Sequence, residues 1–403
     1  MARRIRVVQM IYGFGVEGAG GGVGRFAIEL SRALDPGRFE VSIYGLWDRG
    51  TPFEHEWVRQ LNAEGIGAFI AARWDENRPY RSFWRAFRAI QSALSQKPAD
   101  IVHSHHEFAD VVALLLKARL KPPAIMRTVH YGYRYEWKKR PLRRLLLTNL
   151  LYPLLFNVEI GISQAIVENL NRRPLSRLLR RQALCVHNAI DLGRFSDTKT
   201  DPVGKRRSLN LPEDAPIIGT VGRLTEQKGY AFLVEAGGLV LQHLPNAYFL
   251  IVGDGELKET LMDQAQRLGI ASHVIFTGPR SDIEALLHCM DIFASPSLWE
   301  GLPTVIMESM AAGVPVIGTD IPGTRDLIQH RITGWLVPPA DSRALAEAIL
   351  TMMGSPSLRR EIACRAREAV QRFSITEVAK TYAALYQATY GDRTTRNSPT
   401  SST

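Results

Sequence analysis

The chain has 403 residues, of which 45% are hydrophobic and 22% charged, and its formal net charge is +10. This length exceeds what one hydrophobic core usually serves, and the composition is that of a globular protein rather than of a disordered or membrane-spanning one. The three cysteines, Cys185, Cys289 and Cys364, include no CxxC pair. They therefore indicate neither a disulfide framework nor a zinc site, and they fit a reducing, cytoplasmic compartment.

Two apolar stretches resemble export or membrane signals at first sight. Residues 5–12 follow basic residues, but the run breaks into glycine without a cleavage site, so we interpret it as a first strand. Residues 145–156 are too few to span a bilayer. We therefore expect no transmembrane segment.

Short β-branched runs alternate with helical periodicity, which is typical of parallel βα units. The pattern occurs twice, on either side of a polar stretch at 197–216. The first half contains expected strands at 5–11, 40–46, 68–71, 100–105, 124–130, 158–163 and 184–190. The second half contains expected strands at 217–223, 248–253, 274–278, 291–295, 314–318 and 335–337. We predict an α/β protein of two doubly wound, Rossmann-like domains that face each other across a cleft, where ligands should bind.

The domain boundaries follow from this pattern. Residues 1–196 should form the first domain and residues 197–372 the second. The segment from Ala340 onward is expected to form successive helices, of which 373–392 would return to the first domain. Residues 393–403 are rich in Ser and Thr and lack an apolar anchor, so we expect a disordered tail.

A glycine-rich loop follows the first expected strand. Gly13, Gly15 and Gly18 match the GxGxxG spacing of a dinucleotide-binding turn, which leaves a nicotinamide-dependent oxidoreductase as an alternative. More glycines follow before the helix, however, and no acidic residue ends the second strand at the ribose-binding distance. We interpret Gly21 and Gly22 as part of a loop that enters a helix N-terminus, where free amides favour an anion; a plain flexible turn is the simpler reading.

Two cations follow the first strand of the second half, within the run VGRLTEQKG. Arg223 offers phosphate oxygens a rigid fork, and Lys228 offers a point charge. Together they could neutralise a departing diphosphate. Each alone would be an ordinary surface charge.

The segment from Ser297 to Gly313 predicts strand, loop and helix, with Pro303 in the first helical turn and Gly313 at the C-terminal cap. Glu308 stands out because the rest of this helix is nearly all apolar, and a buried carboxylate needs a partner such as ribose hydroxyls. Glu300 precedes the helix in the loop at the carboxyl edge of the sheet. An exposed Glu300 and a snorkelling Glu308 remain the simpler alternative.

Charge is concentrated between Tyr131 and Arg181, where eleven bases face three acids. This excess suits an anionic partner such as membrane headgroups, a phosphorylated acceptor or nucleic acid, although a solvated basic face explains it as well. Tyr131, Tyr133 and Tyr135 could stack on bases, so a nucleic-acid-binding protein is an alternative. This alternative leaves Glu300 and Glu308 unexplained, so we expect no nucleic acid partner. The neighbouring leucines favour docking on an anionic inner membrane face, unless they only pack the first domain.

Several short motifs follow one another along the chain in a specific order and spacing. They are Gly21-Gly22, Thr128-Val129-His130, Gly161-Ile162-Ser163, Asn188-Ala189-Ile190-Asp191, Gly222-Arg223, Lys228-Gly229, and Glu300 and Glu308 with seven residues between them. Through these motifs the chain resembles, over almost its whole length, the retaining glycosyltransferases of the GT-B class, family 4. One departure is Ala189, where the family commonly has glycine.

The resemblance implies roles for these residues. Arg223 and Lys228 would hold the donor pyrophosphate and replace a divalent metal, so no cofactor is expected. Glu300 would bind donor-sugar hydroxyls, Glu308 the ribose, and His130 would lie beside the transferred sugar. The remaining donor-binding residues would be Gly21, Gly22, Arg280, Gly301, Leu302, Thr304 and Val305, those after Glu300 through backbone amides and Arg280 through backbone near the nucleobase.

The resemblance also implies a reaction that retains anomeric configuration by front-face displacement, in which the leaving phosphate helps to deprotonate the acceptor. UDP-linked and GDP-linked sugars fit equally well. The acceptor would be a glycan, a lipid-linked saccharide or a phosphorylated glycan of the cell envelope or an exopolysaccharide.

His103, His105 and His106 with Glu107 suggest a metal site, but no nearby carboxylate completes a convincing one.

Overall fold

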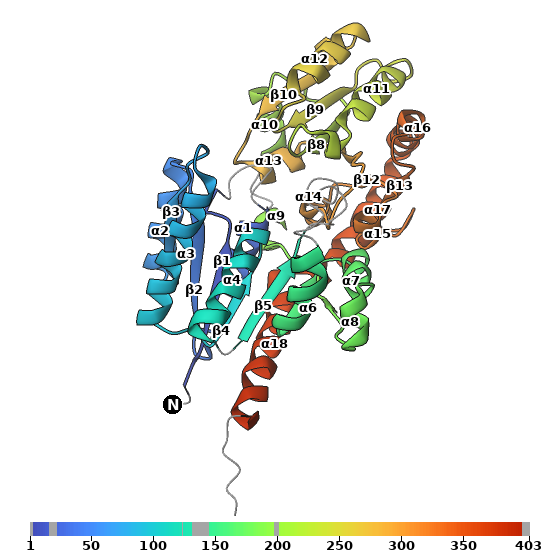
Figure 1. Ribbon diagram of the computed structural model, residues 1–403. Coiled ribbons are helices and arrows are strands. Elements are labelled where there is room, and N and C mark those ends of the chain that lie inside the picture. Colours follow the sequence, from blue (N-terminus) through green and yellow to red (C-terminus); the bar gives the residue numbers. More distant parts are fainter. Residues whose placement is uncertain (1–2, 16–21, 123, 131–144, 197–200, 397–403) are drawn as a thin grey trace, which may run out of the picture. The chain divides into compact units, whose positions relative to one another are not determined.

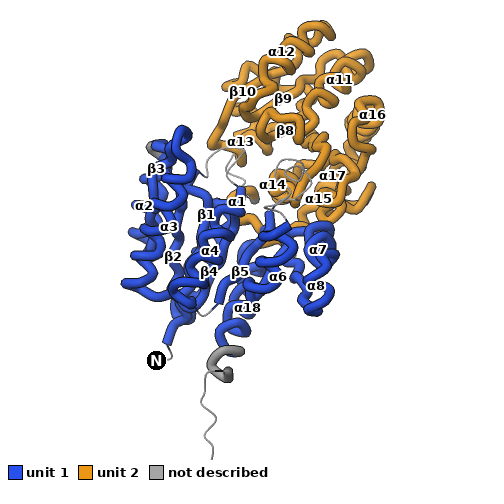
Figure 2. Tube along the Cα trace, in the orientation of Figure 1, with its two compact units in different colours: residues 1–16, 21–188, 375–403 blue, residues 17–20, 189–374 orange. Residues whose placement is uncertain are grey.

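The computed structural model describes residues 3–15, 22–122, 124–130, 145–196 and 201–396, and its chain divides into two compact units. Of the described residues, unit 1 contains those up to Asn188 together with those from Ile375 onward, and unit 2 contains Ala189–Ser374 (Figure 2). The boundary between the units therefore lies after Asn188, eight residues before the one expected from the sequence.

Unit 1 is built on a seven-stranded parallel sheet in the order β3-β2-β1-β4-β5-β6-β7 (Figure 1). Its strands are β1 (Ile5–Ile11), β2 (Phe39–Asp48), β3 (Gly67–Arg73), β4 (Ile101–Ser104), β5 (Ala124–Val129), β6 (Val158–Gly161) and β7 (Leu184–Cys185). Its helices are α1 (Gly22–Ala33), α2 (Pro52–Ala63), α3 (Pro79–Gln96), α4 (Glu107–Leu120), the π-helix η2 (Leu145–Leu151), α6 (Tyr152–Leu155), α7 (Gln164–Asn171), α8 (Pro174–Leu178) and α18 (Ile375–Arg396).

Both faces of this sheet are buried, which explains its nearly continuous apolar strands. Val8 and Met10 of β1 pack in the core formed with α3 and α4, whereas Ile11 packs in the core formed with α1 and α2. This alternation follows from the two-residue period of a strand. Helix α18 contacts α1 and β1, so it covers the same face as α1.

Unit 2 is built on a six-stranded parallel sheet in the order β10-β9-β8-β11-β12-β13. Its strands are β8 (Ile217–Val221), β9 (Tyr248–Val252), β10 (Val274–Gly278), β11 (Ile292–Ser295), β12 (Val316–Thr319) and β13 (Trp335–Val337). Its helices are α9 (Gly193–Ser196), α10 (Pro202–Ser208), η3 (Glu226–Lys228), α11 (Tyr230–Leu241), α12 (Lys258–Arg267), η4 (Ala271–His273), α13 (Ile283–His288), α14 (Thr304–Ala312), α15 (Pro322–Arg325), α16 (Ser342–Met353), α17 (Pro356–Ala369) and η5 (Val370–Phe373).

The predicted α/β class and the two Rossmann-like sheets are confirmed, and all thirteen expected strands are present. The strand expected at 184–190 is shorter, because β7 pairs only with the last two residues of β6. Pro303 is the residue before α14 rather than part of its first turn, and Gly313 caps the helix as expected, at φ 73°.

The end of the chain differs from the expectation. Helix α18 continues to Arg396, four residues into the segment that we expected to be disordered. The physical reason is local, because residues 392–396 contain no glycine or proline that would break the helix. Residues 397–403 lie outside the described part.

Candidate active site

In unit 2, the turn after β8 packs tightly against the loop after β11. Gly229 has φ +62°, and a Cβ placed there would lie 2.1 Å from the carbonyl oxygen of Pro296. A Cβ on Gly222 would lie 2.3 Å from the hydroxyl of Tyr230. Only glycine allows these approaches, and the left-handed conformation at Gly229 would strain any other residue. The two loops are therefore held against each other at the carboxyl edge of the sheet, where open α/β sheets bind ligands.

Glu300 lies at the centre of this contact. Its Oε1 accepts from Lys228 Nζ at 2.6 Å and from Ser297 Oγ at 2.9 Å, and its Oε2 accepts from Gln227 Nε2 at 3.2 Å. The side chain is 8% exposed. Three donors thus hold one buried carboxylate in a single orientation.

Ser297 and Gln227 were not singled out from the sequence. Both flank residues that were, because Ser297 begins the Glu300 segment and Gln227 precedes Lys228. Gln227 also donates to the carbonyl of Trp299 at 3.0 Å and accepts at its own carbonyl from the N–H of Leu298 at 2.8 Å. It joins the two loops through both side chain and backbone.

Arg223 lies on the same turn as Lys228, and its side chain is exposed. No other described residue hydrogen-bonds or ion-pairs with its guanidinium. Lys228, by contrast, is only 16% exposed and is bound to Glu300. The two cations therefore differ in what they offer a ligand, because Arg223 is free to turn toward it whereas Lys228 is held in place.

The start of α14 presents donors without partners. The N–H groups of Gly301, Leu302, Thr304 and Val305 donate to no other described residue. The first N–H groups of any helix lack partners inside the helix and favour anions or ligand oxygens. Leu302 is 5% exposed, so its side chain packs inward while its backbone remains in the loop.

Glu308 lies in the buried part of α14 and is 9% exposed. Every residue from Ile306 to Ala312 is buried, which agrees with the apolar pattern from which Glu308 stood out. Glu308 is therefore not an exposed side chain.

Arg280 follows β10 and is bound to Asp282. Its Nε donates to Asp282 Oδ1 at 2.8 Å and its Nη2 to Oδ2 at 2.7 Å, and Lys205 Nζ lies 2.7 Å from the same carboxylate. The Arg280 hydrogen bonds hold the pKa of Asp282 well below its usual range. The guanidinium of Arg280 is thus bound to Asp282 within unit 2. The contact expected between this segment and the nucleobase would therefore have to come from the backbone.

In unit 1, His130 directly follows β5 and is 5% exposed. Its Nε2 lies 3.2 Å from Nδ1 of His105, which is also buried. Gly22 begins α1, whereas Gly21 lies outside the described residues. Helix α1 thus lies in the same unit as His130.

The nearby histidines do not form a metal site. No group of three or more His, Cys, Asp or Glu in the described chain is arranged to hold a metal ion. His103 instead bonds to the hydroxyls of Tyr386 and Thr128, at 2.7 and 2.9 Å. Burial lowers the pKa of His103 and of His130 to about 3 and that of His105 well below its usual value, so all three are neutral near pH 7.

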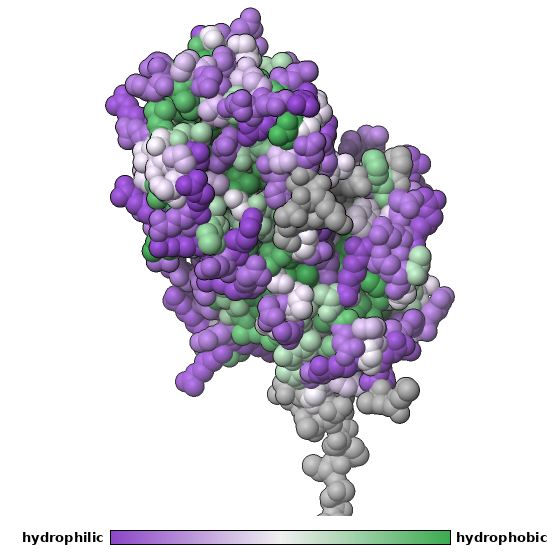
Figure 3. Space-filling view, turned by 180° about the vertical axis from the view of Figure 1, so that it is seen from behind, coloured by the Kyte–Doolittle hydropathy of each residue, from purple (hydrophilic) through white to green (hydrophobic). Residues whose placement is uncertain are grey.

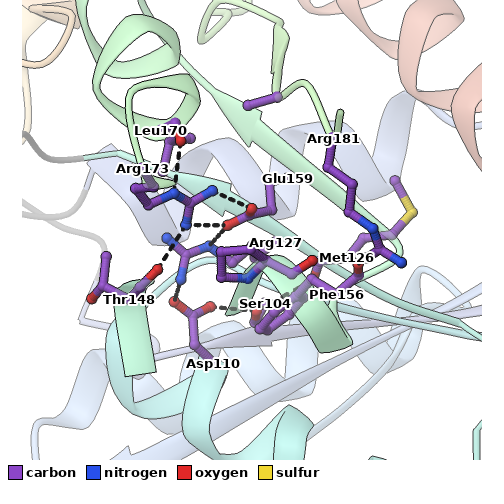
Figure 4. A network of polar contacts seen from close by, with 12 residues as sticks. Ser104, Asp110, Met126, Arg127, Thr148, Phe156, Glu159, Leu170, Arg173 and Arg181 are labelled. Carbon is purple, nitrogen blue, oxygen red and sulfur yellow. Dashed lines mark hydrogen bonds and ion pairs between the residues drawn. The ribbon is translucent and has the colours of Figure 1, made fainter. Parts of the chain in front are cut away.

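Two arginines of the basic segment, Arg173 and Arg181, bind other residues of unit 1. Arg173 is 6% exposed and donates to Glu159 and to the carbonyl of Thr148, as Figure 4 shows. Arg181 donates to the carbonyls of Pro153 and Phe156 at 2.9 and 2.8 Å. Arg173 is therefore buried and paired with a carboxylate, whereas Arg181 is bonded only to neutral carbonyls and stays exposed. Residues 131–144 lie outside the described part.

Known proteins resemble the chain throughout both units. A family profile described as Glycosyltransferase Family 4 matches residues 20–194, and one described as Glycosyl transferases group 1 matches residues 204–369. The Escherichia coli UDP-Gal:alpha-D-GlcNAc-diphosphoundecaprenol alpha-1,3-galactosyltransferase is 26% identical over 71% of this chain and 75% of its own length. The putative Bacillus subtilis glycosyltransferase EpsD is 28% identical over 77% of this chain and 82% of its own.

Solved structures share the fold. The Anabaena protein HepE, crystallised with UDP-glucose, superposes with a TM-score of 0.80 at 20% identity, covering 96% of this chain and all of that one. Sucrose-phosphate synthase from Thermosynechococcus elongatus gives 0.81 at 22% identity over the same shares. Together with the two profiles and the pair of Rossmann-like sheets, these likenesses show that the chain is an enzyme of family 4 of the GT-B glycosyltransferases.

Proposed function

We propose that this enzyme transfers a hexosyl group from a UDP-linked sugar to a lipid-linked or glycan acceptor of the cell envelope or an exopolysaccharide, with retention of configuration. The observation that carries the proposal is the clamped Glu300, 2.6 Å from Lys228 and next to the unpartnered N–H groups that begin α14. A carboxylate accepts from sugar hydroxyls, the amides donate to sugar oxygens, and the cation binds phosphate oxygens.

Each group has one role in the proposed reaction. Lys228 and Arg223 bind the pyrophosphate and stabilise the charge that develops on the leaving diphosphate. Glu300 and the amides of Gly301, Leu302, Thr304 and Val305 orient the transferred sugar. Glu308 binds the ribose, backbone near Arg280 meets the base, and the glycine loop at Gly21 and Gly22 adds amides near the phosphates.

The proposed donor is UDP-linked because similar proteins use uridine nucleotides. The name of the Escherichia coli relative specifies UDP-Gal, and the Anabaena structure contains UDP-glucose. We propose that no metal is needed, since two cations lie on the turn where a diphosphate would bind. The proposed retention uses front-face displacement, in which the leaving phosphate takes the acceptor proton.

Thermal unfolding with UDP, GDP and their hexose conjugates, with and without EDTA, tests the donor. Selective stabilisation by uridine nucleotides, unchanged by EDTA, is expected, because a ligand stabilises the folded state in proportion to the logarithm of its saturation. Selective stabilisation by GDP would replace the proposed base. Transfer to a lipid-diphosphate saccharide, followed by proton NMR of the product anomer, tests the reaction, and an inverted product would overturn the mechanism.

We further propose that unit 1 docks on an anionic lipid surface through η2, α6 and α8. These helices pack on one another and carry large exposed apolar side chains. The exposed leucines are Leu145 at 58%, Leu146 at 47%, Leu150 at 43%, Leu154 at 41%, Leu178 at 78% and Leu179 at 40%. Arg177 and Arg180 are exposed beside Leu178 and Leu179, which suits negatively charged headgroups.

The apolar helices are firmly attached to the sheet behind them. Thr148, Tyr152 and Phe156 point inward, and the buried Arg127 lies 4.2 Å from the Tyr152 ring centre. Arg127 also binds Asp110 at 3.0 Å, within the network of Figure 4. Elsewhere, on the face seen in Figure 3, hydrophilic residues predominate and hydrophobic ones are scattered. No helix in the described chain is long and apolar enough to cross a bilayer.

Flotation with vesicles tests this surface. The protein should float with vesicles that contain anionic lipid and not with purely zwitterionic ones, and the double variant Leu150→Ser, Leu178→Ser should lose flotation. Leu268→Ser is the control, because Leu268 is a similarly exposed leucine of unit 2, at 44%. Equal flotation with both lipids, or by the double variant, would show that the leucines do not dock on the membrane.

A further inference from the structure

The outer face of α3 in unit 1 carries aromatic and basic side chains and no acidic ones. Helix α3 contains neither Asp nor Glu. Tyr80 is 79% exposed and Trp84 is 45% exposed. Arg81, Arg85 and Arg88 are exposed as well. The helix therefore presents two rings and three guanidinium groups to solvent.

The helical period explains why these side chains share a face. The two rings are four residues apart, and the three arginines follow one another at intervals of four and three. Residues at these spacings lie on one side of a helix, so the rings and the arginines form adjacent stripes. The opposite side of α3 is buried in the core with α4, through Ala86, Phe87, Ile90 and Leu94. The apolar side of this amphipathic helix is thus already used within the unit.

The three arginines have no carboxylate partner in the described chain, unlike other arginines of unit 1. Arg6, for example, binds Glu40 at 3.1 Å. No described residue hydrogen-bonds or ion-pairs with the guanidinium groups of α3. Arg81 also lies in the first turn, where the helix dipole disfavours a cation and favours an anion. A bound anion would relieve this repulsion and pair with the guanidinium groups.

The exposed ring of Trp84 is held in place by two neighbours. Its centre lies 5.6 Å from that of Phe83 and 5.7 Å from that of Phe87, at interplanar angles of 78° and 86°. These contacts restrict the side chain, so a ligand that stacks on it immobilises little further. The negative face of such a ring attracts the C–H groups of a sugar ring.

Further rings continue from α3 toward the carboxyl edge of the sheet. Phe83 lies 6.4 Å from Phe108 of α4, and Phe108 stacks on His106 at 5.8 Å between ring centres. His106 in turn lies 4.7 Å from Tyr12, which follows β1. All four side chains are half-buried. The row of rings thus leads from the outer face of α3 to the edge where open α/β sheets bind ligands.

This surface differs in chemistry from the leucine-rich one on η2, α6 and α8. No Leu, Ile or Val of α3 is exposed, and its exposed large apolar side chains are Tyr80 and Trp84. An interfacial helix inserts its apolar face into the lipid, whereas the apolar face of α3 lies in the core. Planar rings beside guanidinium groups match sugar rings that carry carboxylates or phosphates.

We propose that the outer face of α3 binds an anionic glycan. Its sugar rings stack on Tyr80 and Trp84, and its carboxylates or phosphates bind Arg81, Arg85 and Arg88. The choice of a glycan rests on the proposed function, since an enzyme that builds a polysaccharide has to hold the saccharide chain. The site lies entirely within unit 1, and the saccharide that the enzyme extends is an acidic one.

Calorimetric titration at about 0.15 M salt, with octagalacturonate as an acidic oligosaccharide and maltooctaose as a neutral one, tests the site without any need for activity. The acidic oligomer should bind at least about tenfold more tightly. The double variant Arg81→Gln, Arg85→Gln should weaken its binding at least about tenfold, because charge-assisted hydrogen bonds are lost. Arg177→Gln, Arg180→Gln is the control, because it removes the same charge from exposed positions of unit 1 and should stay within about twofold.

Trp84→Leu tests the stacking separately from the charge. It should weaken the binding of octagalacturonate about threefold to tenfold, while the thermal transition stays cooperative. Phe53→Leu is the matched control and should bind as the wild type does. Phe53 is 54% exposed at the start of α2, which packs on the other face of the sheet.

Several results would overturn the proposal. Equal binding of the two oligosaccharides, or equal losses in the two double arginine variants, would reduce this face to general positive charge. Failure to bind octagalacturonate, with vesicle flotation that is lost in Arg81→Gln, Arg85→Gln, would make it a lipid surface. Tighter binding of a single-stranded oligonucleotide, weakened by the same variant, would make it a nucleic-acid surface.

The titration also separates this inference from the proposed function. A protein that transfers sugar but binds neither oligosaccharide would refute the glycan site and leave the proposed function standing. A protein that binds octagalacturonate through α3 but transfers no sugar would refute the proposed function alone.

Discussion

The ammonium of Lys228 lies 2.6 Å from Glu300 Oε1, and the two side chains are only 16% and 8% exposed. Residues 72 positions apart in the sequence thus form one ion pair, at the point where the turn after β8 meets the loop after β11. Because the pair is nearly buried, removal of either charge would leave the other uncompensated.

Replacement of Glu300 by glutamine should lower kcat by at least about a hundredfold, because the amide keeps the shape but loses the negative charge that orients the sugar. The thermal transition should stay cooperative. Glu377→Gln, at an exposed glutamate of α18, is the control and should retain full activity. Activity of Glu300→Gln near that of the control would remove Glu300 from the mechanism.

Replacement of Lys228 by alanine should weaken UDP binding by about ten- to a hundredfold, the worth of one hydrogen bond to a charged group. Isothermal titration with UDP measures this change directly. Lys380→Ala removes a lysine that is 68% exposed and should bind UDP as the wild type does. If both variants bound UDP equally well, the phosphate contact would have to lie elsewhere.

Gly229→Ala should destabilise unit 2 more than Gly269→Ala does, by about 2 kcal/mol or more, because only the first creates a clash. Both glycines have positive φ, +62° and +70°, so both variants are strained. The added Cβ meets the Pro296 oxygen at 2.1 Å in the first case and nothing within 4 Å in the second. Denaturant unfolding compares them, and equal losses would mean that the loops separate easily.

Unit 1 should lose stability as the pH falls from 6.5 toward 4. The lowered pKa values of His103, His105 and His130 mean that unfolding takes up to three protons in this range. Burial raises the pKa of Asp110 to about 6, so unfolding releases up to one proton there, with the opposite sign. The net uptake approaches two protons, which corresponds to at most about 2.7 kcal/mol per pH unit.

Urea unfolding at pH 7, 6 and 5, followed by a signal of unit 1 such as Trp47, measures this slope. Trp47 is suitable because it is fully buried in the core with α3 and α4. If the stability stayed constant or rose as the pH falls from 7 to 5, the histidines would have to be charged in the folded protein.

Much of the fold could be predicted from local patterns. The strands at 5–11, 274–278 and 335–337 were predicted to the residue, because buried parallel strands are short β-branched runs bounded by turns. Less could be predicted at edges. The strand expected at 184–190 ends at Cys185, since its length depends on the partner strand rather than on its own residues.

Only some residues of the candidate site could be predicted from the sequence, again because contacts with distant segments leave no local pattern. Glu300, Glu308 and Lys228 stood out because a charge in an apolar run or beside a glycine turn is unusual within the sequence itself. The buried hydrogen bond between Gln9 and Tyr386 could not be predicted, because the two residues are 377 positions apart and each is ordinary in its own helix or strand.

By itself, the sequence determined two parallel sheets, the turns that follow their strands and the residue types at the carboxyl edges, because those depend on periodicity and on neighbours along the chain. The tertiary structure alone decided which charges are free. It left Arg223 exposed, paired Lys228 with Glu300, paired Arg173 and Arg280 with carboxylates, and placed His130 beside the buried His105. The physical reason is that burial and hydrogen bonding, which set charge state and tautomer, arise between segments far apart in the chain.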